Sequence, residues 1–163
     1  MENYIVINGK KAELTPEQLK ALGIEVKKSS LFERVYGTDN LYYCIRENGI
    51  VTGYRDGGDF SGSLHQIANY CTDRKLMQQR AYLEILNRLL WRYSIENDGD
   101  KIDWSSCAKK KYYIILDKNK FDVTWTYACG NIFNTYFISQ SVAEAAIKEI
   151  VEPFMEAHPD FKL

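Results

Sequence analysis

The longest stretch of regularly spaced apolar residues runs from about Asp73 to Ile95. Its apolar positions recur three or four residues apart, as on one side of a helix: Leu76, Met77, Ala81, Leu83, Leu86, Leu89, Leu90 and Tyr93. The run Asn97-Asp98-Gly99-Asp100 follows and contains residue types that form turns. The pattern therefore predicts one long amphipathic helix in the middle of the chain.

A second helical pattern begins at about Ser141. Ser141 and Glu144 have the spacing of a capping box, and the apolar residues Ala143, Ile147, Ile150 and Phe154 follow on one side. Pro153 is expected to kink or end this helix because proline has no backbone N–H to donate.

Strand patterns occupy two further regions. Leu41–Ile45 and Ile50–Tyr54 flank the turn Glu47-Asn48-Gly49, which predicts a pair of central strands. Later, Tyr112–Leu116, Phe121–Tyr127 and Ile132–Ile138 predict a three-stranded meander. In its middle strand, Phe121, Val123, Trp125 and Tyr127 alternate with polar residues, so this face is expected to pack on the C-terminal helix.

The N-terminal residues 1–26 form a candidate hairpin–helix module. Tyr4–Ile7 reads as a strand, and Asn8-Gly9 is a favoured two-residue hairpin turn. Thr15-Pro16-Glu17-Gln18 then combines a helix N-cap, a first-turn proline and a capping-box glutamine. Gly23 is well placed to end the short helix.

Together these elements predict a single α+β domain over residues 1–163. An antiparallel sheet, made from the N-terminal hairpin, the central strands and the C-terminal meander, is expected to pack against the long helix and the C-terminal helix. A chain of 163 residues is long enough to bury a full core.

Charge and cysteine spacing narrow the classes of function. The chain has 21 Lys and Arg residues against 22 Asp and Glu residues, which argues against a general polyanion binder. Its cysteines, Cys44, Cys71, Cys107 and Cys129, are too widely spaced for a zinc knuckle or a redox dithiol. We expect four free thiols and a location in the cytoplasm, since the N-terminus lacks the pattern of a signal peptide.

Two clusters of carboxylates and two histidines are the candidates for catalysis or metal binding: Asp56 and Asp59, then Asp98, Asp100 and Asp103, and finally His65 and His158. Both acidic clusters contain glycine and lie where secondary structure stops, which favours turn formation. The histidines have no partner at ligand spacing. The sequence therefore predicts no catalytic residue, no metal site and no cofactor.

Basic and aromatic residues are the candidates for partner binding. Arg80, Arg88 and Arg92 are spaced at multiples of four along the long helix, which predicts a basic stripe along one side. The alternative is a solvated face with intrahelical ion pairs, one of them to Glu84.

The chain also contains 12 tyrosines. Tyr36, Tyr42 and Tyr54 are expected to be exposed, because the central strands have no obvious helix for both faces.

Several segments, spread over most of the chain, resemble a group of small accessory proteins from phages and prophages of Gram-positive gut bacteria: Ile7-Asn8-Gly9-Lys10-Lys11 with Leu14-Thr15, Phe32-Glu33-Arg34-Val35 with the tyrosine strand after it, Asn69-Tyr70-Cys71-Thr72-Asp73, Leu89-Leu90-Trp91-Arg92, Glu152-Pro153-Phe154-Met155 and His158-Pro159-Asp160-Phe161. The resemblance transfers no catalytic residue. It implies a phage setting, in which small non-enzymatic proteins often bind and block host machinery, CRISPR effectors included.

We therefore expect a non-enzymatic phage protein that binds and inhibits a host protein, with a CRISPR effector nuclease as the candidate target. Its partner-binding residues would be Arg80, Arg88, Arg92, Tyr36, Tyr42 and Tyr54. The alternative is a nucleic-acid-binding accessory protein that uses the same arginines with Lys109–Lys111. An enzyme with an unrecognised site is the third and least favoured hypothesis.

Overall fold

A computed structural model describes residues 4–7, 10–23, 30–34, 37–56, 59–130 and 134–162. In chain order the elements are β1 (Tyr4–Ile7), β2 (Lys10–Glu13), α1 (Pro16–Ala21), β3 (Gly37–Ile45), β4 (Val51–Asp56), α2 (Asp59–Gln66), α3 (Arg74–Glu96), the 3-10 turn η1 (Gly99–Lys101), β5 (Lys111–Asp117), β6 (Lys120–Thr126), α4 (Gln140–Ala146), the π-helical segment η2 (Ile147–Val151) and α5 (Glu152–Ala157). The predicted mixture of helices and antiparallel strands is confirmed. Within the described ranges, however, the strands form three separate two-stranded hairpins and not one sheet.

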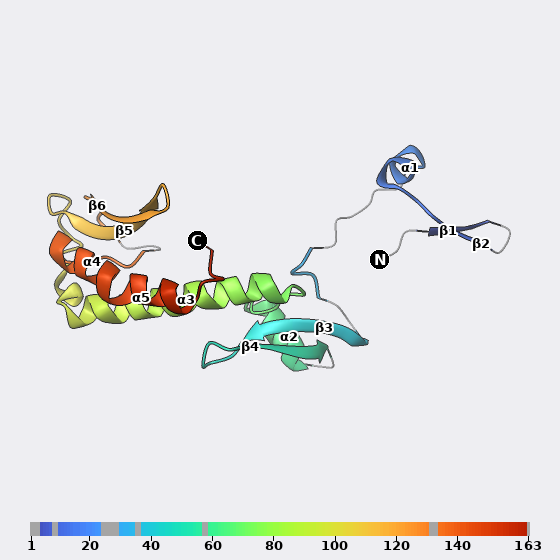
Figure 1. Ribbon diagram of the computed structural model, residues 1–163, viewed down its shortest axis with the longest axis horizontal. Coiled ribbons are helices and arrows are strands. Elements are labelled where there is room, and N and C mark those ends of the chain that lie inside the picture. The colour runs from blue at the N-terminus through green and yellow to red at the C-terminus, as the bar shows by residue number, and fades with distance from the viewer. Residues whose placement is uncertain are drawn as a thin grey trace.

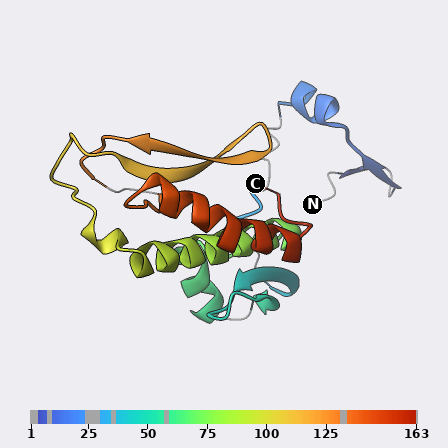
Figure 2. The same cartoon turned by 60° about the vertical axis from the view of Figure 1, so that its left-hand side comes forward.

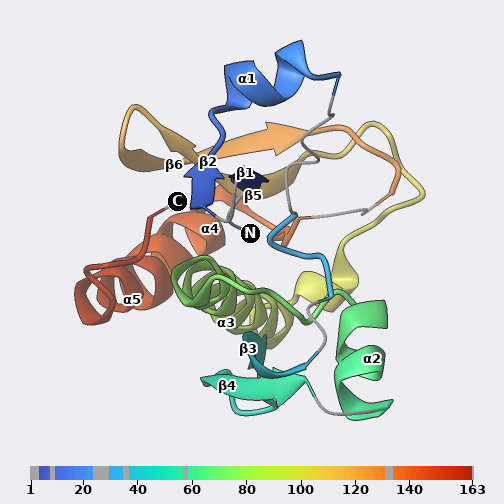
Figure 3. The ribbon, with the colours of Figure 1, turned by 90° about the vertical axis from the view of Figure 1, so that its right-hand side faces the viewer.

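The long helix α3 lies at the centre of the fold (Figures 1 and 3). Asp73 caps its start, because one carboxylate oxygen accepts hydrogen bonds from the backbone N–H groups of Lys75 and Leu76 at 2.7 and 3.1 Å. The hairpin β5–β6 and the helices α4 and α5 pack on one side of α3, and the hairpin β3–β4 with α2 lies on another. The long helix was predicted correctly.

The larger core joins α3, the C-terminal helices and β5–β6. Leu86 and Leu90 of α3 meet Phe137, Ala143, Ala146, Val151, Phe154 and Phe161. The C-terminal helix is capped by Ser139, whose hydroxyl accepts from the N–H of Val142 at 3.3 Å, and not by Ser141 as expected. Pro153 falls in the first turn of α5, directly after the π-helical segment. The helix does not end at Pro153 but continues to Ala157, and the irregularity next to the proline is the π-helical segment before it.

The C-terminal meander is not confirmed as three strands. β5 and β6 pair along their whole length, from Lys111↔Thr126 to Asp117↔Lys120. The expected third strand is represented by one isolated bridge, Tyr112↔Phe137, and residues 131–133 lie outside the described residues.

The expected packing of the β6 face is only partly right. Phe121 and Val123 pack on the core, whereas Trp125 and Tyr127 are exposed. These two rings contact each other at 4.9 Å between centroids, and Lys110 Nζ lies 4.2 Å from the centre of Trp125. An edge-to-face contact of these two rings at the open end of the hairpin thus replaces the expected packing on the helix.

The hairpin β3–β4 is covered on both faces, contrary to expectation. Ile45 and Val51 face Met77 and Ala81 of α3. On the other face, Tyr42 and Cys44 pack with Tyr70, beside Leu64 of α2. Tyr42 is 1% exposed, and its ring stacks on Tyr70 at 4.5 Å. The prediction that Tyr42 is exposed is therefore wrong, because α2 and Tyr70 cover the face that lacked an obvious partner in the sequence.

The prediction of four free thiols is wrong for two of the cysteines. Cys44 and Cys71 are buried free thiols. Cys107 and Cys129 form a disulfide with Cα atoms 5.4 Å apart. The pairing of β5 with β6 brings the segment before one strand next to the segment after the other, and a separation of 22 residues gave no sign of this.

The local N-terminal elements agree with the sequence. Ile7 pairs with Lys10, as in a two-residue hairpin, although Asn8 and Gly9 themselves lie outside the described residues. The capping box forms both of its bonds: Gln18 Oε1 accepts from the N–H of Thr15 at 2.8 Å, and Thr15 Oγ1 accepts from the N–H of Gln18 at 3.3 Å. β1, β2 and α1 stand apart from α3 (Figure 2), and a separate module over 1–26 stays a prediction. Among the helices described, none is both long and apolar enough to cross a membrane.

Candidate binding groove on α3

The hairpin β3–β4 covers only the first half of α3 on its side (Figure 1). Met77 and Ala81 are buried beneath it. The hairpin ends at its turn, Glu47–Gly49, which lies beside Ile85. Further along the helix, Trp91 and Ile95 are exposed at 61% and 40%. The second half of α3 therefore presents an open face.

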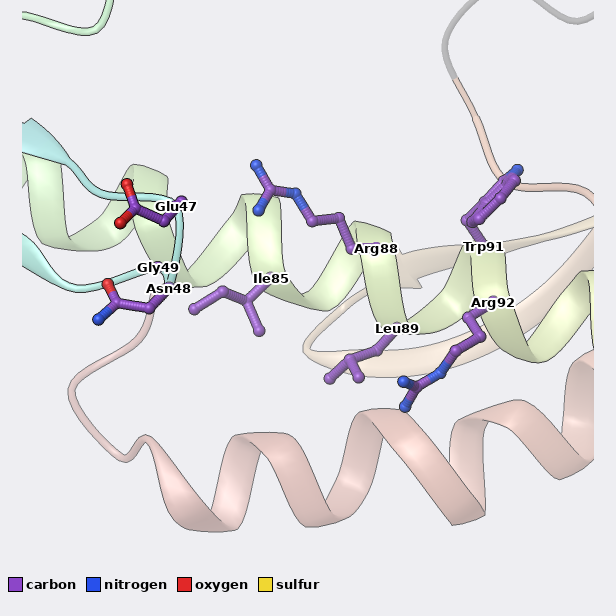
Figure 4. A pocket seen from close by; sticks show the side chains of 8 residues that line it. All are labelled: Glu47, Asn48, Gly49, Ile85, Arg88, Leu89, Trp91 and Arg92. Atoms are coloured by element: carbon purple, nitrogen blue, oxygen red, sulfur yellow. The ribbon is translucent and has the colours of Figure 1, made fainter.

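A groove of about 420 Å³ follows this open face. It is lined by Glu47, Asn48, Gly49, Ile85, Arg88, Leu89, Trp91 and Arg92. Figure 4 shows Arg88 and Trp91 along one edge and Leu89 and Arg92 along the other, with the turn at one end. The term α3 groove refers to this set of residues from here on.

The turn forms a fixed end wall for the groove. Gly49 has a φ of +80°, and a Cβ added to it would lie 2.7 Å from Ile85 Cδ1. The Gly49 N–H donates to the Arg46 carbonyl at 2.8 Å, and Asn48 Oδ1 accepts from the Ile50 N–H at 3.1 Å. Glycine is needed here both for its conformation and for its close approach to the helix.

Among the described residues, the two arginines of the groove make only weak ion pairs along the helix. Arg88 Nη2 lies 3.4 Å from Glu84 Oε2, and Arg92 Nε lies 4.0 Å from Glu96 Oε1. Their side chains are 64% and 67% exposed. Exposed pairs at this spacing contribute about 0.3–0.5 kcal/mol, so both guanidinium groups can turn to a partner at little cost.

Arg80 has a structural position, unlike the other two arginines of the predicted stripe. Its Nε contacts Glu84 Oε1 at 2.9 Å, and its Nη1 donates to the carbonyl of Ala68. Ala68 has a φ of 56°, so this bond secures a left-handed residue just after α2. Each step of four residues advances about 40° around a helix, so Arg92 points about 120° away from Arg80. The even spacing therefore does not keep all three side chains on one surface.

The predicted tyrosines do not join the groove where the structure describes them. Tyr42 is buried. Tyr54 is half-buried, accepts a hydrogen bond from Arg46 Nη1 at 2.6 Å and meets the edge of Phe60. Tyr36 lies outside the described residues. Sequence reasoning missed Trp91, although a tryptophan between two arginines and off the apolar stripe was a usable signal.

The groove supplies binding chemistry. It combines two cations, an exposed indole and the apolar side chains of Ile85 and Leu89, a set suited to a carboxylate or phosphate next to an apolar group. In the part of the chain that the structure describes, no three His, Cys, Asp or Glu side chains converge to hold a metal ion.

No protein-family model matches this chain, and neither a curated protein nor a solved structure matches it.

Proposed function

We propose that this protein is a non-enzymatic, phage-encoded inhibitor that binds a host protein in the host cytoplasm and that docks through the α3 groove. The observation that carries the proposal is an exposed tryptophan that shares a concave surface with two exposed arginines, beside Arg88 on one edge and across from Arg92 on the other. Tryptophan and arginine are the residues most enriched among interface hot spots. An exposed Trp91 has little structural use, because it leaves most of its ring in water.

The chemistry of the groove favours an acidic segment of the partner. Arg88 and Arg92 stand on opposite edges and can each pair with a carboxylate. An apolar side chain between them would cover Ile85 and Leu89, and contact with Trp91 would remove its ring from water.

A CRISPR effector nuclease is the candidate target, and it rests on the resemblance to phage accessory proteins. With a formal net charge of -1, the chain carries too little negative charge to imitate DNA. The inhibition would therefore be steric or allosteric.

The test is capture of the partner from host lysate by the full chain, with identification by mass spectrometry and then measurement of affinity. The variant Arg88→Glu/Arg92→Glu should weaken binding more than tenfold, since hot-spot truncations cost about 2 kcal/mol or more. Lys118→Glu/Lys120→Glu is the matched control, because it changes the net charge equally at the exposed turn between β5 and β6. Equal affinities for the two variants would remove the groove from the interface.

Nucleic-acid binding is the second candidate, since Trp91 beside arginines is also a platform for stacking a base. A duplex and a single-stranded oligonucleotide of random sequence should be tested at several salt concentrations. Two results together would favour this candidate. The logarithm of the affinity should fall with the logarithm of the salt concentration, at a slope of about 0.9 per phosphate contact for a duplex and about 0.7 for a single strand. The groove variant should also lose this affinity.

A further inference from the structure

The chain after α5 returns to the beginning of α3, at the end of the helix opposite to the groove (Figure 2). A second hollow lies there. Its volume is about 610 Å³. It is lined by Arg74, Lys75, Gln78, Gln79, Asp160 and Lys162. The term basic pocket refers to these six residues, none of which belongs to the α3 groove.

The returning chain is fixed to α3 by specific bonds. Gln79 Nε2 donates to the Asp160 carbonyl at 2.8 Å, and Gln79 Oε1 accepts from the Lys162 N–H at 2.7 Å. Between these two residues, Phe161 is buried against Phe154 and Tyr82. The backbone that carries Lys162 is therefore held beside the second turn of the helix.

Three cations line the pocket without a compensating ion pair. Across the described ranges, Arg74, Lys75 and Lys162 make no ion pair, and the carboxylate of Asp160 accepts a hydrogen bond from Tyr82 Oη at 3.4 Å. Elsewhere on α3, Arg80 and Arg92 each have a glutamate four residues later. Arg74 and Lys75 have Gln78 and Gln79 at those positions, so the sequence leaves their charges unbalanced.

The three cations repel one another, and the carboxylates of Asp73 at the N-cap and of Asp160 offset this repulsion only in part. Cations in the first turn of a helix oppose the helix dipole, which favours negative charge at that end. The bonds from Gln79 also hold Lys162 near Arg74 and Lys75, and this third cation increases the repulsion between them. A bound anion would add attractive interactions with each cation and with the N-terminal end of the helix, and these would offset the repulsion.

We infer that the basic pocket binds a small phosphate-bearing molecule of nucleotide size. The lining has three cations and one carboxylate, and with the neighbouring Asp73 carboxylate at the N-cap the positive charges still exceed the negative ones, which favours a phosphate anion. Guanidinium and ammonium groups are the usual partners of phosphate, and the Gln78 amide supplies a neutral donor beside them. The volume falls within the range of roughly 300–1,000 Å³ found for small-molecule sites. The inference is independent of the α3 groove and of its protein partner.

The test is a titration of the full chain with inorganic pyrophosphate at constant ionic strength, followed by ¹H–¹⁵N NMR. We expect saturable, one-to-one shifts of the Lys75, Gln79 and Lys162 amides, with the Gln78 side-chain amide moving together with them. Arg74→Gln/Lys162→Gln should weaken binding about tenfold or more, since it removes two charge-assisted contacts. Lys118→Gln/Lys120→Gln, which removes the same charge elsewhere, should bind like the unmodified chain.

Thermal unfolding separates loss of the site from loss of the fold. Without ligand, Arg74→Gln/Lys162→Gln should melt no lower than the unmodified chain, because the substitutions relieve repulsion. The inference is overturned by shifts that do not saturate, by equal weakening in both double variants, or by a random single-stranded oligonucleotide that binds this pocket more tightly than pyrophosphate. The last result would assign the pocket to a nucleic-acid track.

Discussion

The two halves of α3 belong to one continuous helix but have different surroundings. In the first half, Met77 and Ala81 are buried under β3–β4, and Arg80 is bound to the carbonyl of Ala68. In the second half, on the same side, Trp91 is exposed and Arg92 has only a 4.0 Å ion pair. The comparison shows that the non-local element covering this side of the helix decides whether a residue there is buried or exposed, whereas the opposite side of the second half, with Leu86 and Leu90, is buried in the larger core.

Replacing one large side chain in each half should give the largest contrast. Met77→Ala removes a side chain that is 1% exposed and leaves a cavity beneath the hairpin, so it should lower the free energy of unfolding by about 2–5 kcal/mol. Trp91→Ala removes a larger but mostly exposed side chain, so it should change the free energy of unfolding by no more than about 0.5 kcal/mol. Urea denaturation of both variants makes the comparison. A similar loss of stability for Trp91→Ala would mean that Trp91 supports the fold, and this would contradict its assignment to partner binding.

The contact between the turn and the helix marks the boundary between the halves. Gly49→Ala should destabilise the fold by about 1–2 kcal/mol through its positive φ alone, and further because the new methyl group meets Ile85 Cδ1. Ile85→Val removes that atom. In a double-mutant cycle, Gly49→Ala should therefore cost less in the Ile85→Val background, by about 0.5 kcal/mol or more. Equal costs in the two backgrounds would show that the turn does not press on the helix.

Much of the local structure could be predicted from the sequence. The long helix, the N-terminal capping box and the hairpin around Glu47–Gly49 follow from short-range spacing and turn chemistry, and all three are present. The cover over Tyr42 and the bond between Cys107 and Cys129 could not be predicted in this way. Both depend on which distant segment packs against which face, and periodicity along the chain contains no such information.

The same limit applies to the candidate site. The spacing of Arg80, Arg88 and Arg92 indicated a shared side of the helix, and the structure brings Arg88 and Arg92 to one groove. It separates Arg80, because four-residue steps drift around the helix and because α2 ends within reach of its guanidinium group. The groove exists only because the hairpin stops at Gly49, and no pattern within α3 reports where another element ends.

The arginines themselves give a smaller contrast in stability. Arg80→Ala removes charge-assisted bonds to Ala68 and Glu84 and should cost about 1 kcal/mol after allowance for the 37% exposure of its side chain. Arg88→Ala removes one exposed pair and should cost less than about 0.5 kcal/mol. Chemical denaturation at low salt measures both. The opposite order would place the structural arginine in the second half of the helix and contradict the assignment of the groove.

The smallest expected effect lies just beyond the open half of α3, at Asp103. Hydrogen bonds from Ser105 and Lys109, of which the one from Ser105 has the larger effect, lower the pKa of this carboxyl group to about 2. An unfolded aspartate titrates near pH 3.9, so the carboxylate favours the folded state above about pH 4, and this preference is lost as the pH falls toward 2. ¹³C NMR titration should show Ser105→Ala raising the pKa more than Lys109→Gln does, because the Ser105 hydroxyl is the larger cause. Both variants should lower the free energy of unfolding at pH 7 only slightly, because the Asp103 side chain is 35% exposed and solvent screens its interactions. A marked loss of stability at pH 7 would mean that the region after the open half of α3 is held as firmly as the covered half, and the contrast between the halves would fail.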